Sequence, residues 1–179
     1  MKVLKYILVI VIAVVVLVLV VAAFAPNKYA VEREVTILQP KSEVFDYIKY
    51  LQNQDNYSVW AKKDPEMRKM QKGVDGTVGY ISAWESDNKE VGKGEQEIVN
   101  IVEGERMDVV LRFKEPFEAT DDAYFITESL NDYTTLVKWG FKGQMDYPMN
   151  LMLLFMDMET MLGNDLQQGL DNLKDLLER

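Results

Sequence analysis

The chain has 179 residues, with 20 Lys and Arg against 29 Asp and Glu, and it contains neither Cys nor His. This length suffices for one domain with its own core and one accessory segment. The missing residue types exclude disulfides, thiolate nucleophiles, Cys-ligated zinc and histidine acid–base chemistry. The acidic balance argues against nucleic acid as a partner, because the phosphate backbone would be repelled.

Residues 6–25 form an uninterrupted run that is uncharged and almost wholly apolar. At about 1.5 Å per residue, a helix of this length spans about 30 Å, the thickness of a bilayer core. Lys2 and Lys5 precede the run, as in a cleavable signal peptide. The run is longer than a usual signal core, however, and Pro26 would directly follow a cut after Ala25. The sequence therefore favours an uncleaved transmembrane anchor over residues 1–28, with residues 6–25 in the membrane.

The charges around this run predict the orientation of the anchor. Lys2, Lys5 and Lys28 are the only charged residues in 1–28, so residues 29–179 carry 17 basic and 29 acidic residues, a net charge of −12. The positive-inside rule places the N-terminus in the cytoplasm, although Lys28 and Arg33 on the far side weaken the bias. We expect a single-pass membrane protein whose domain is extracytoplasmic.

The first elements after the anchor are a strand and two short helices. Residues 29–37 alternate between apolar and polar side chains, as in a half-buried strand, and Pro40 ends it. Residues 41–50 place apolar side chains at helical spacing. A second short helix or irregular segment is expected over residues 53–60.

From Met67 onward the apolar period changes to two, which predicts strands. Turn-forming residues such as Asp75-Gly76 separate them, so consecutive strands pair antiparallel. Residues 148–179 then repeat apolar side chains at three-to-four spacing, which predicts one long helix with a single buried face. The pattern indicates an α+β fold with six further strands: 67–72, 77–85, 94–102, 107–113, 123–129 and 134–142.

Four short motifs stand out in this order of elements: Pro40–Phe45, Trp60, Thr135–Trp139 and Gly163–Lys174. With them, the chain resembles the START-like superfamily, also called SRPBCC or Bet v 1-like, and in particular its polyketide cyclase/dehydrase and lipid-transport group. The resemblance covers about residues 31–177. It implies a helix-grip fold over residues 29–179, in which a seven-stranded antiparallel sheet wraps a long C-terminal helix and leaves an apolar cavity. Members bind lipids, sterols, polyketides or other hydrophobic molecules, and some catalyse cyclisation or hydrolysis.

A helical wheel of residues 148–179 gives the first candidates for the cavity wall, and aromatic residues on the strands give the others. Glu159 is the one charge in the apolar stripe of the helix. In the first reading, Glu159 faces the cavity and orients a ligand or acts as an acid or base. In the second reading, its side chain reaches water or pairs with a basic residue of the sheet, and the sequence favours this second reading. The candidates are Trp60, Tyr80, Trp84, Phe113, Trp139, Met152, Phe155, Met158 and Glu159.

The first half of the predicted helix is apolar nearly all round. Met149, Leu153, Leu154, Met156 and Met161 lie off its core face. Either the short helices and the neighbouring loop cover these side chains, or the side chains form an exposed patch that meets a membrane or a partner. The sequence favours the first alternative, in which they are covered.

Acidic pairs give no catalytic or metal signature. Asp121 and Asp122 sit beside a strand start, where adjacent side chains point to opposite faces, and we interpret them as solvated turn charges. No cofactor motif or metal-ligand set is recognised.

The leading hypothesis is membrane-tethered binding or transport of a hydrophobic small molecule or lipid. With no recognisable catalytic constellation, the sequence argues against an enzyme. The alternative is a cyclase or hydrolase that uses Glu159 with Tyr80 in the same cavity. A second alternative is a protein-interaction module that docks a partner on the apolar part of the last helix.

Overall fold

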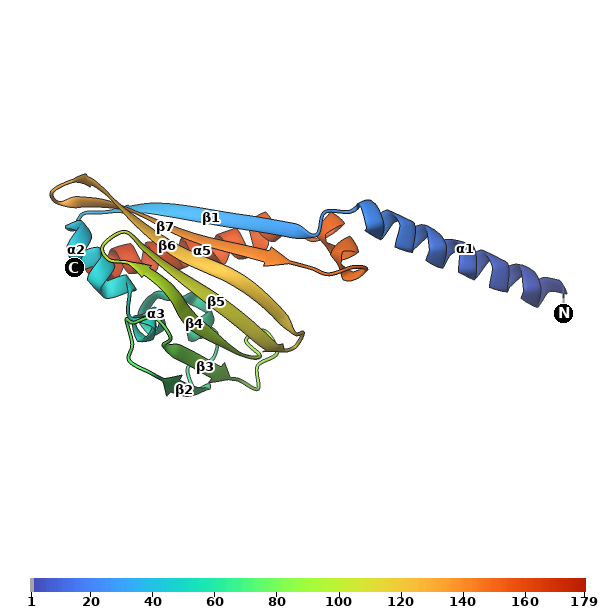
Figure 1. The fold of residues 1–179 in the computed structure, drawn as a ribbon, viewed down its shortest axis with the longest axis horizontal. Helices are drawn as coiled ribbons and strands as arrows, with labels where there is room; N and C mark the ends of the chain where they lie inside the picture. The colour runs from blue at the N-terminus through green and yellow to red at the C-terminus, as the bar shows by residue number, and fades with distance from the viewer. Residues whose placement is uncertain (1) are drawn as a thin grey trace.

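The computed structural model describes residues 2–179 and has one seven-stranded antiparallel sheet in the order β1-β7-β6-β5-β4-β3-β2. The sheet wraps around the C-terminal helix α5, and the short helices follow β1 (Figure 1). The predicted α+β helix-grip fold is confirmed. The strands are β1 Lys28–Ile37, β2 Arg68–Lys72, β3 Ile81–Glu85, β4 Lys93–Val102, β5 Arg106–Glu115, β6 Ala119–Asn131 and β7 Thr134–Gln144. The helices are α1 Lys2–Phe24, α2 Lys41–Ile48, η1 Leu51–Asn53, α3 Gln54–Tyr57, α4 Val59–Lys63, η2 Met149–Leu154 and α5 Met158–Leu177, where η marks a 3-10 helix.

The strands lie in the predicted order, but two of them begin well away from the predicted position: β6 begins four residues earlier, at Ala119, and β3 begins later. The sequence predicts a strand from Thr77, whereas β3 begins at Ile81. Gly73, Gly76 and Gly79 all have positive φ, which L side chains rarely adopt, and the chain turns there. The amide of Tyr80 donates to the carbonyl of Thr77, so a turn occupies the predicted beginning of the strand.

The C-terminal helix is shorter than predicted, and the expectation of one helix over residues 148–179 is wrong. A 3-10 helix, η2, is followed by a break, and α5 begins at Met158. Asp157 caps α5, because its carboxylate accepts a hydrogen bond from the Thr160 amide at 3.0 Å. The amide group of Asn150 in η2 instead donates to the carbonyls of Ala22 and Ala25 at the end of α1.

The core lies between α5 and the concave face of the sheet. Leu166, Leu170 and Leu173 of α5 are buried against it. Gly169 lets Trp139 of β7 approach the helix, because a Cβ atom at this position would lie 2.7 Å from the Trp139 ring. Trp139 also stacks on Phe125 of β6, with 4.7 Å between ring centroids.

Helix α1 projects away from the domain (Figure 1). It is the one helix within residues 2–179 that is long and apolar enough to cross a membrane, and almost all of its side chains are exposed. Only residues 25–27 separate it from β1. Ala22 is the one residue of α1 that is buried, beneath η2.

Candidate functional site

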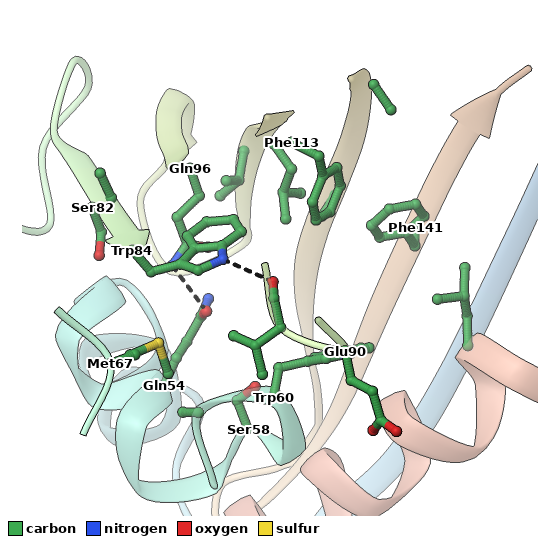
Figure 2. Close-up of a pocket in the computed structure, with 18 of the residues that line it drawn as sticks. Gln54, Ser58, Trp60, Met67, Ser82, Trp84, Glu90, Gln96, Phe113 and Phe141 are labelled. Atoms are coloured by element: carbon green, nitrogen blue, oxygen red, sulfur yellow. Dashed lines mark hydrogen bonds between the residues drawn. The ribbon is translucent and has the colours of Figure 1, made fainter. Parts of the chain in front are cut away.

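A cavity of about 350 Å³ lies between the concave face of the sheet and the helices α3, α4 and α5. Strands β3 to β7 supply its floor, α3 and α4 form one side, and Leu162 and Leu166 of α5 form another. Figure 2 shows these side chains converging from the sheet and from the helices. The lining is mostly aliphatic and aromatic, as in sites that bind small organic ligands.

A cross-strand row of aromatic side chains forms the first part of the floor. The register places Trp84 beside Gly94, Gly94 beside Phe113, and Phe113 beside Ala119. Trp84 and Phe113 pack edge to face across the glycine, with 5.9 Å between ring centroids. A Cβ atom on Gly94 would lie 2.6 Å from the Trp84 ring, so only glycine leaves room for the ring at this position. Because the indole N–H of Trp84 donates to the Val91 carbonyl at 3.2 Å, it offers a ligand only its apolar face.

The next row of the floor carries polar groups. Ser82, Gln96, Leu111 and Asp121 are neighbours across four strands. The amide nitrogen of Gln96 donates to the side-chain oxygen of Gln54 in α3, at 3.2 Å, and Figure 2 shows this bond closing the space between sheet and helix. This bond leaves the amide nitrogen of Gln54 as a donor for a ligand.

Asp121 is the buried charge beside the cavity. It lies on the same face of β6 as Ala119 and Ala123, which line the cavity, and it is 6% exposed. The prediction of a solvated turn charge is therefore wrong for Asp121, because β6 begins at Ala119 and directs this side chain inward. Burial raises the pKa of Asp121, and the Gln144 amide, which donates to its carboxylate at 3.3 Å, only partly offsets this.

Tyr29 of β1 faces the same buried region. Burial, together with the charge of Asp121, raises the pKa of Tyr29 to about 12. The ring stacks on Phe141, which lines the cavity, with 6.2 Å between centroids. A protonated phenol and a carboxyl group with a raised pKa thus lie behind Phe141, outside the cavity lining itself.

Two hairpin tips border the cavity, and they stand at the strand ends on the same side of the sheet as the beginning of β1, across β7 and β6 from it (Figure 1). Glu90 and Val91 come from the β3–β4 connection, and Pro116 and Phe117 come from the β5–β6 connection. Asp121, two residues into β6, accepts a hydrogen bond from Gln144, and Gln144 pairs with Lys28 at the start of β1. The exposed ring of Phe117 therefore lies at the α1 end of the sheet.

Four of the nine predicted side chains line the cavity: Trp60, Trp84, Phe113 and Trp139. Trp60 of α4 and Trp139 of β7 meet edge to face, with 6.1 Å between centroids. Tyr80 does not line the cavity. Its ring is buried in the core, and its hydroxyl accepts a hydrogen bond from Gln52 at 3.3 Å.

The other four predicted residues lie outside the cavity: Met152 and Phe155 precede the break before α5, and Met158 and Glu159 stand in its first turn, ahead of Leu162 and Leu166, which line the cavity. Phe155 is 84% exposed, Met152 is exposed and Met158 is half-buried at the first turn of α5. Glu159 forms an ion pair with Arg33 of β1 at 2.6 Å, and its side chain is 61% exposed. The second reading of Glu159, pairing with a basic residue of the sheet, therefore describes its position.

The nine candidates did not include the polar part of the lining, which comprises Gln54, Ser58, Ser82 and Gln96 and the charged residues Asp55, Lys69, Glu90 and Glu115. Ser82 had a signal, because it shares the parity of Trp84 on the same strand. Gln96 and Asp121 could be found only from the register, which aligns them with Ser82 across the sheet. Gln54 and Ser58 lie in a short helical segment with no clear periodicity.

The seven-stranded sheet wrapped on α5 over an apolar cavity defines a helix-grip protein, the architecture of Bet v 1-like proteins. Solved structures with this fold include a protein from Nitrosospira multiformis, with 14% identity over 83% of this chain and 96% of that chain and a TM-score of 0.59. Aha1 from Colwellia psychrerythraea, solved as a dimer, has 11% identity over 84% and 96% of the two chains and a TM-score of 0.57. Ara h 8.0201 has 12% identity over 84% and 98%, with a TM-score of 0.55. These likenesses establish the fold alone, and the sequence matches no family model and no curated protein.

Proposed function

We propose that this protein binds a hydrophobic small molecule or a single lipid chain in the cavity while α1 holds the domain at a membrane. One observation carries the proposal: an apolar space of about 350 Å³ lies between the sheet and α5, with a few convergent polar side chains. Ligand pockets usually occupy about 300–1,000 Å³. The size favours one ring system or one acyl chain over a whole two-chain phospholipid.

The polar groups suit a ligand with one polar end. Gln54, Gln96, Ser58 and Ser82 contribute amide and hydroxyl groups on the side of the cavity near α3. These four groups donate and accept hydrogen bonds but carry no charge. Of the charged lining residues, Asp55 pairs with Lys69 at 2.7 Å and Glu115 pairs with Lys93 at 3.1 Å, and Glu90 lies in the β3–β4 connection. A hydroxyl, carbonyl or protonated carboxyl group on the ligand is therefore the expected partner.

The position of α1 supports a membrane source for the ligand. The hairpin tips with Val91 and Phe117 border the cavity at the end of the sheet where α1 leaves the domain. With α1 across a bilayer and the N-terminus in the cytoplasm, this end faces the outer leaflet. An apolar ligand would then pass between bilayer and cavity along a short path.

The chain itself provides the assay. Its three tryptophans, Trp60, Trp84 and Trp139, all line the cavity, and α1 contains none. We would embed the full chain in phosphatidylcholine nanodiscs and titrate in a brominated fatty acid, which quenches nearby indole fluorescence. Saturable quenching is expected, because the acyl chain would lie among the three indole rings.

A matched pair of variants separates binding in the cavity from quenching by acid dissolved in the bilayer. Ala123→Leu adds side-chain volume to the cavity floor, whereas Thr120→Leu adds the same apolar side chain on the outer face of the same strand. Ala123→Leu should weaken the quenching at least fivefold, and Thr120→Leu should leave it unchanged. Equal quenching in both variants, or none in the unaltered chain, would count against the cavity as the site.

The predicted cyclase or hydrolase pair receives no support from the geometry. Glu159 is paired with Arg33 outside the cavity, and Tyr80 is buried with Gln52. The two side chains share no space in which a substrate could contact both. The binding function is therefore the one that the observations favour.

A further inference from the structure

Residues 147–156, which we call the collar, wrap the C-terminal end of α1. Asn150 donates hydrogen bonds to the carbonyls of Ala22, at 2.7 Å, and Ala25, at 3.1 Å. The hydroxyl of Tyr147 donates to the carbonyl of Leu19 at 3.3 Å. Carbonyl groups in the last turn of a helix lack i+4 partners within the helix, and Asn150 provides a donor to one of them, the carbonyl of Ala22, and to that of Ala25 just beyond the helix.

The surface of the collar is apolar and open. Its ten residues carry no charge, and acidic residues occur only at its borders, Asp146 and Asp157. Phe155 is 84% exposed, Met149 55% and Leu154 48%. The expectation that Met149, Leu153, Leu154, Met156 and Met161 are covered is therefore wrong for Met149, Leu154 and Met161, which are exposed, whereas Leu153 and Met156 are half-buried.

Contact with α1 fixes the depth of the collar relative to a bilayer. Tyr147 reaches Leu19, which lies six residues before Ala25, so the collar overlaps about 9 Å of the helix. If α1 spans the membrane, its last 9 Å lie at the boundary between headgroups and acyl chains, and the collar lies beside them. Tyrosine and other amphipathic aromatics are enriched at that boundary.

We propose that the collar inserts into the bilayer interface and seats the domain on the membrane surface, with Met149, Leu154 and Phe155 among the acyl chains. The proposal rests on the membrane attachment in the proposed function. Lipid is the occupant that the surface fits, because the collar continues the exposed apolar surface of α1 through Phe24. The absence of charge favours zwitterionic lipid over a recognition site for a charged headgroup.

The absence of cysteine makes single-site labelling clean. The full chain would carry an environment-sensitive fluorophore at one introduced cysteine and would be placed in phosphatidylcholine vesicles that contain a nitroxide lipid. The nitroxide, which quenches the fluorophore, would lie either near the headgroup or deep in the acyl chain. The test variant is Phe155→Cys. Val14→Cys reports on the middle of α1. Tyr133→Cys reports on another exposed aromatic position, 75% exposed, in the β6–β7 hairpin at the far end of the sheet.

Label at position 155 should be quenched at least threefold more by the shallow nitroxide than label at 133, and label at 14 should be quenched more by the deep nitroxide. A label at 155 that behaves like 133, while 14 is quenched, overturns the seating and leaves the anchor standing. An unquenched label at 14 overturns the anchor and the seating together. A blue shift at 155 without lipid quenching, rising with protein density, would mean that a second copy covers the collar and also overturns the proposal.

A second variant guards against a label that inserts by itself. With the label at Met149→Cys, the additional change Phe155→Asp places a charge on the collar without touching the labelled site. Shallow quenching at 149 should fall at least twofold, whereas Tyr133→Asp should leave it unchanged. Equal quenching in all three proteins would overturn the proposal, because the collar would then not be held by its own apolar side chains.

Discussion

The hydroxyl of Tyr57 is fully buried and has no hydrogen-bond partner within residues 2–179. Its ring packs edge to face against Trp139, with 5.9 Å between centroids. Tyr57→Phe keeps this contact and removes only the hydroxyl. We therefore expect the substitution to stabilise the protein.

The magnitude follows from the state of the hydroxyl. An unsatisfied buried polar group costs about 1–3 kcal/mol, because water bonds it in the unfolded chain. Loss of the small volume that the oxygen fills offsets part of this gain, so the free energy of unfolding should rise by about 1 kcal/mol. In a domain of this size, such a gain raises the melting temperature by about 2–4 °C.

Tyr80→Phe is the matched control, because Tyr80 is equally buried but its hydroxyl accepts a bond from Gln52. The control should lose about 0.5–1.5 kcal/mol. Thermal and urea denaturation of the full chain, followed by tryptophan fluorescence, would compare the two. If Tyr57→Phe destabilises the protein as the control does, the Tyr57 hydroxyl has a partner in the folded state and the reasoning fails.

Three further substitutions test other parts of the structure. Asp121 has a raised pKa in the folded protein, so the protein should lose stability as the pH rises from the unfolded carboxyl pKa, about 3.9, through that raised value. Urea denaturation at several pH values should show that Asp121→Asn removes this loss, so that the variant has the higher free energy of unfolding at pH 7. If the free energy of unfolding changed with pH in the same way in both proteins, the prediction would be contradicted. Gly94→Ala should lower the free energy of unfolding by about 1–3 kcal/mol, because the new Cβ would lie 2.6 Å from the Trp84 ring and 2.8 Å from the Arg112 carbonyl oxygen. An unchanged free energy of unfolding would mean that the Trp84 ring moves freely. Glu159→Gln should cost less than about 1 kcal/mol, because the Glu159 side chain of the ion pair with Arg33 is 61% exposed and therefore screened by solvent. High salt should remove the difference in stability, and a loss that does not depend on salt would indicate another role for Glu159.

The sheet was predictable because alternation is a local property of extended backbone. Trp84, Phe113 and Trp139 were assigned to the inner face from parity alone, and all three line the cavity. Parity does not distinguish a cavity wall from a filled core, however. Tyr80 has the parity of Trp84, but Gln52 and the adjoining helical segment cover it.

The break before α5 could not be predicted from periodicity. The wheel pattern of α5 continues back through Phe155 and Met152, so a helix is compatible with the sequence there. A contact between distant segments competes with the helical conformation there: Asn150 donates hydrogen bonds to the carbonyls at the end of α1, more than 120 residues earlier. The one local signal was Asp157 followed by Thr160, the spacing of an N-cap residue and the amide it binds.

The junction between α1 and the domain limits how far the cavity can travel. Three residues, extended, reach about 10 Å, and the amide of Met145 already holds one of them by donating to the Asn27 carbonyl at 2.9 Å. A domain on such a tether, once α1 is in a bilayer, samples only the thin layer of solvent above its own patch of membrane. The tethered cavity would therefore meet the apolar molecules of its own membrane at high local concentration. Delivery of a ligand to a second membrane would require a separate carrier protein.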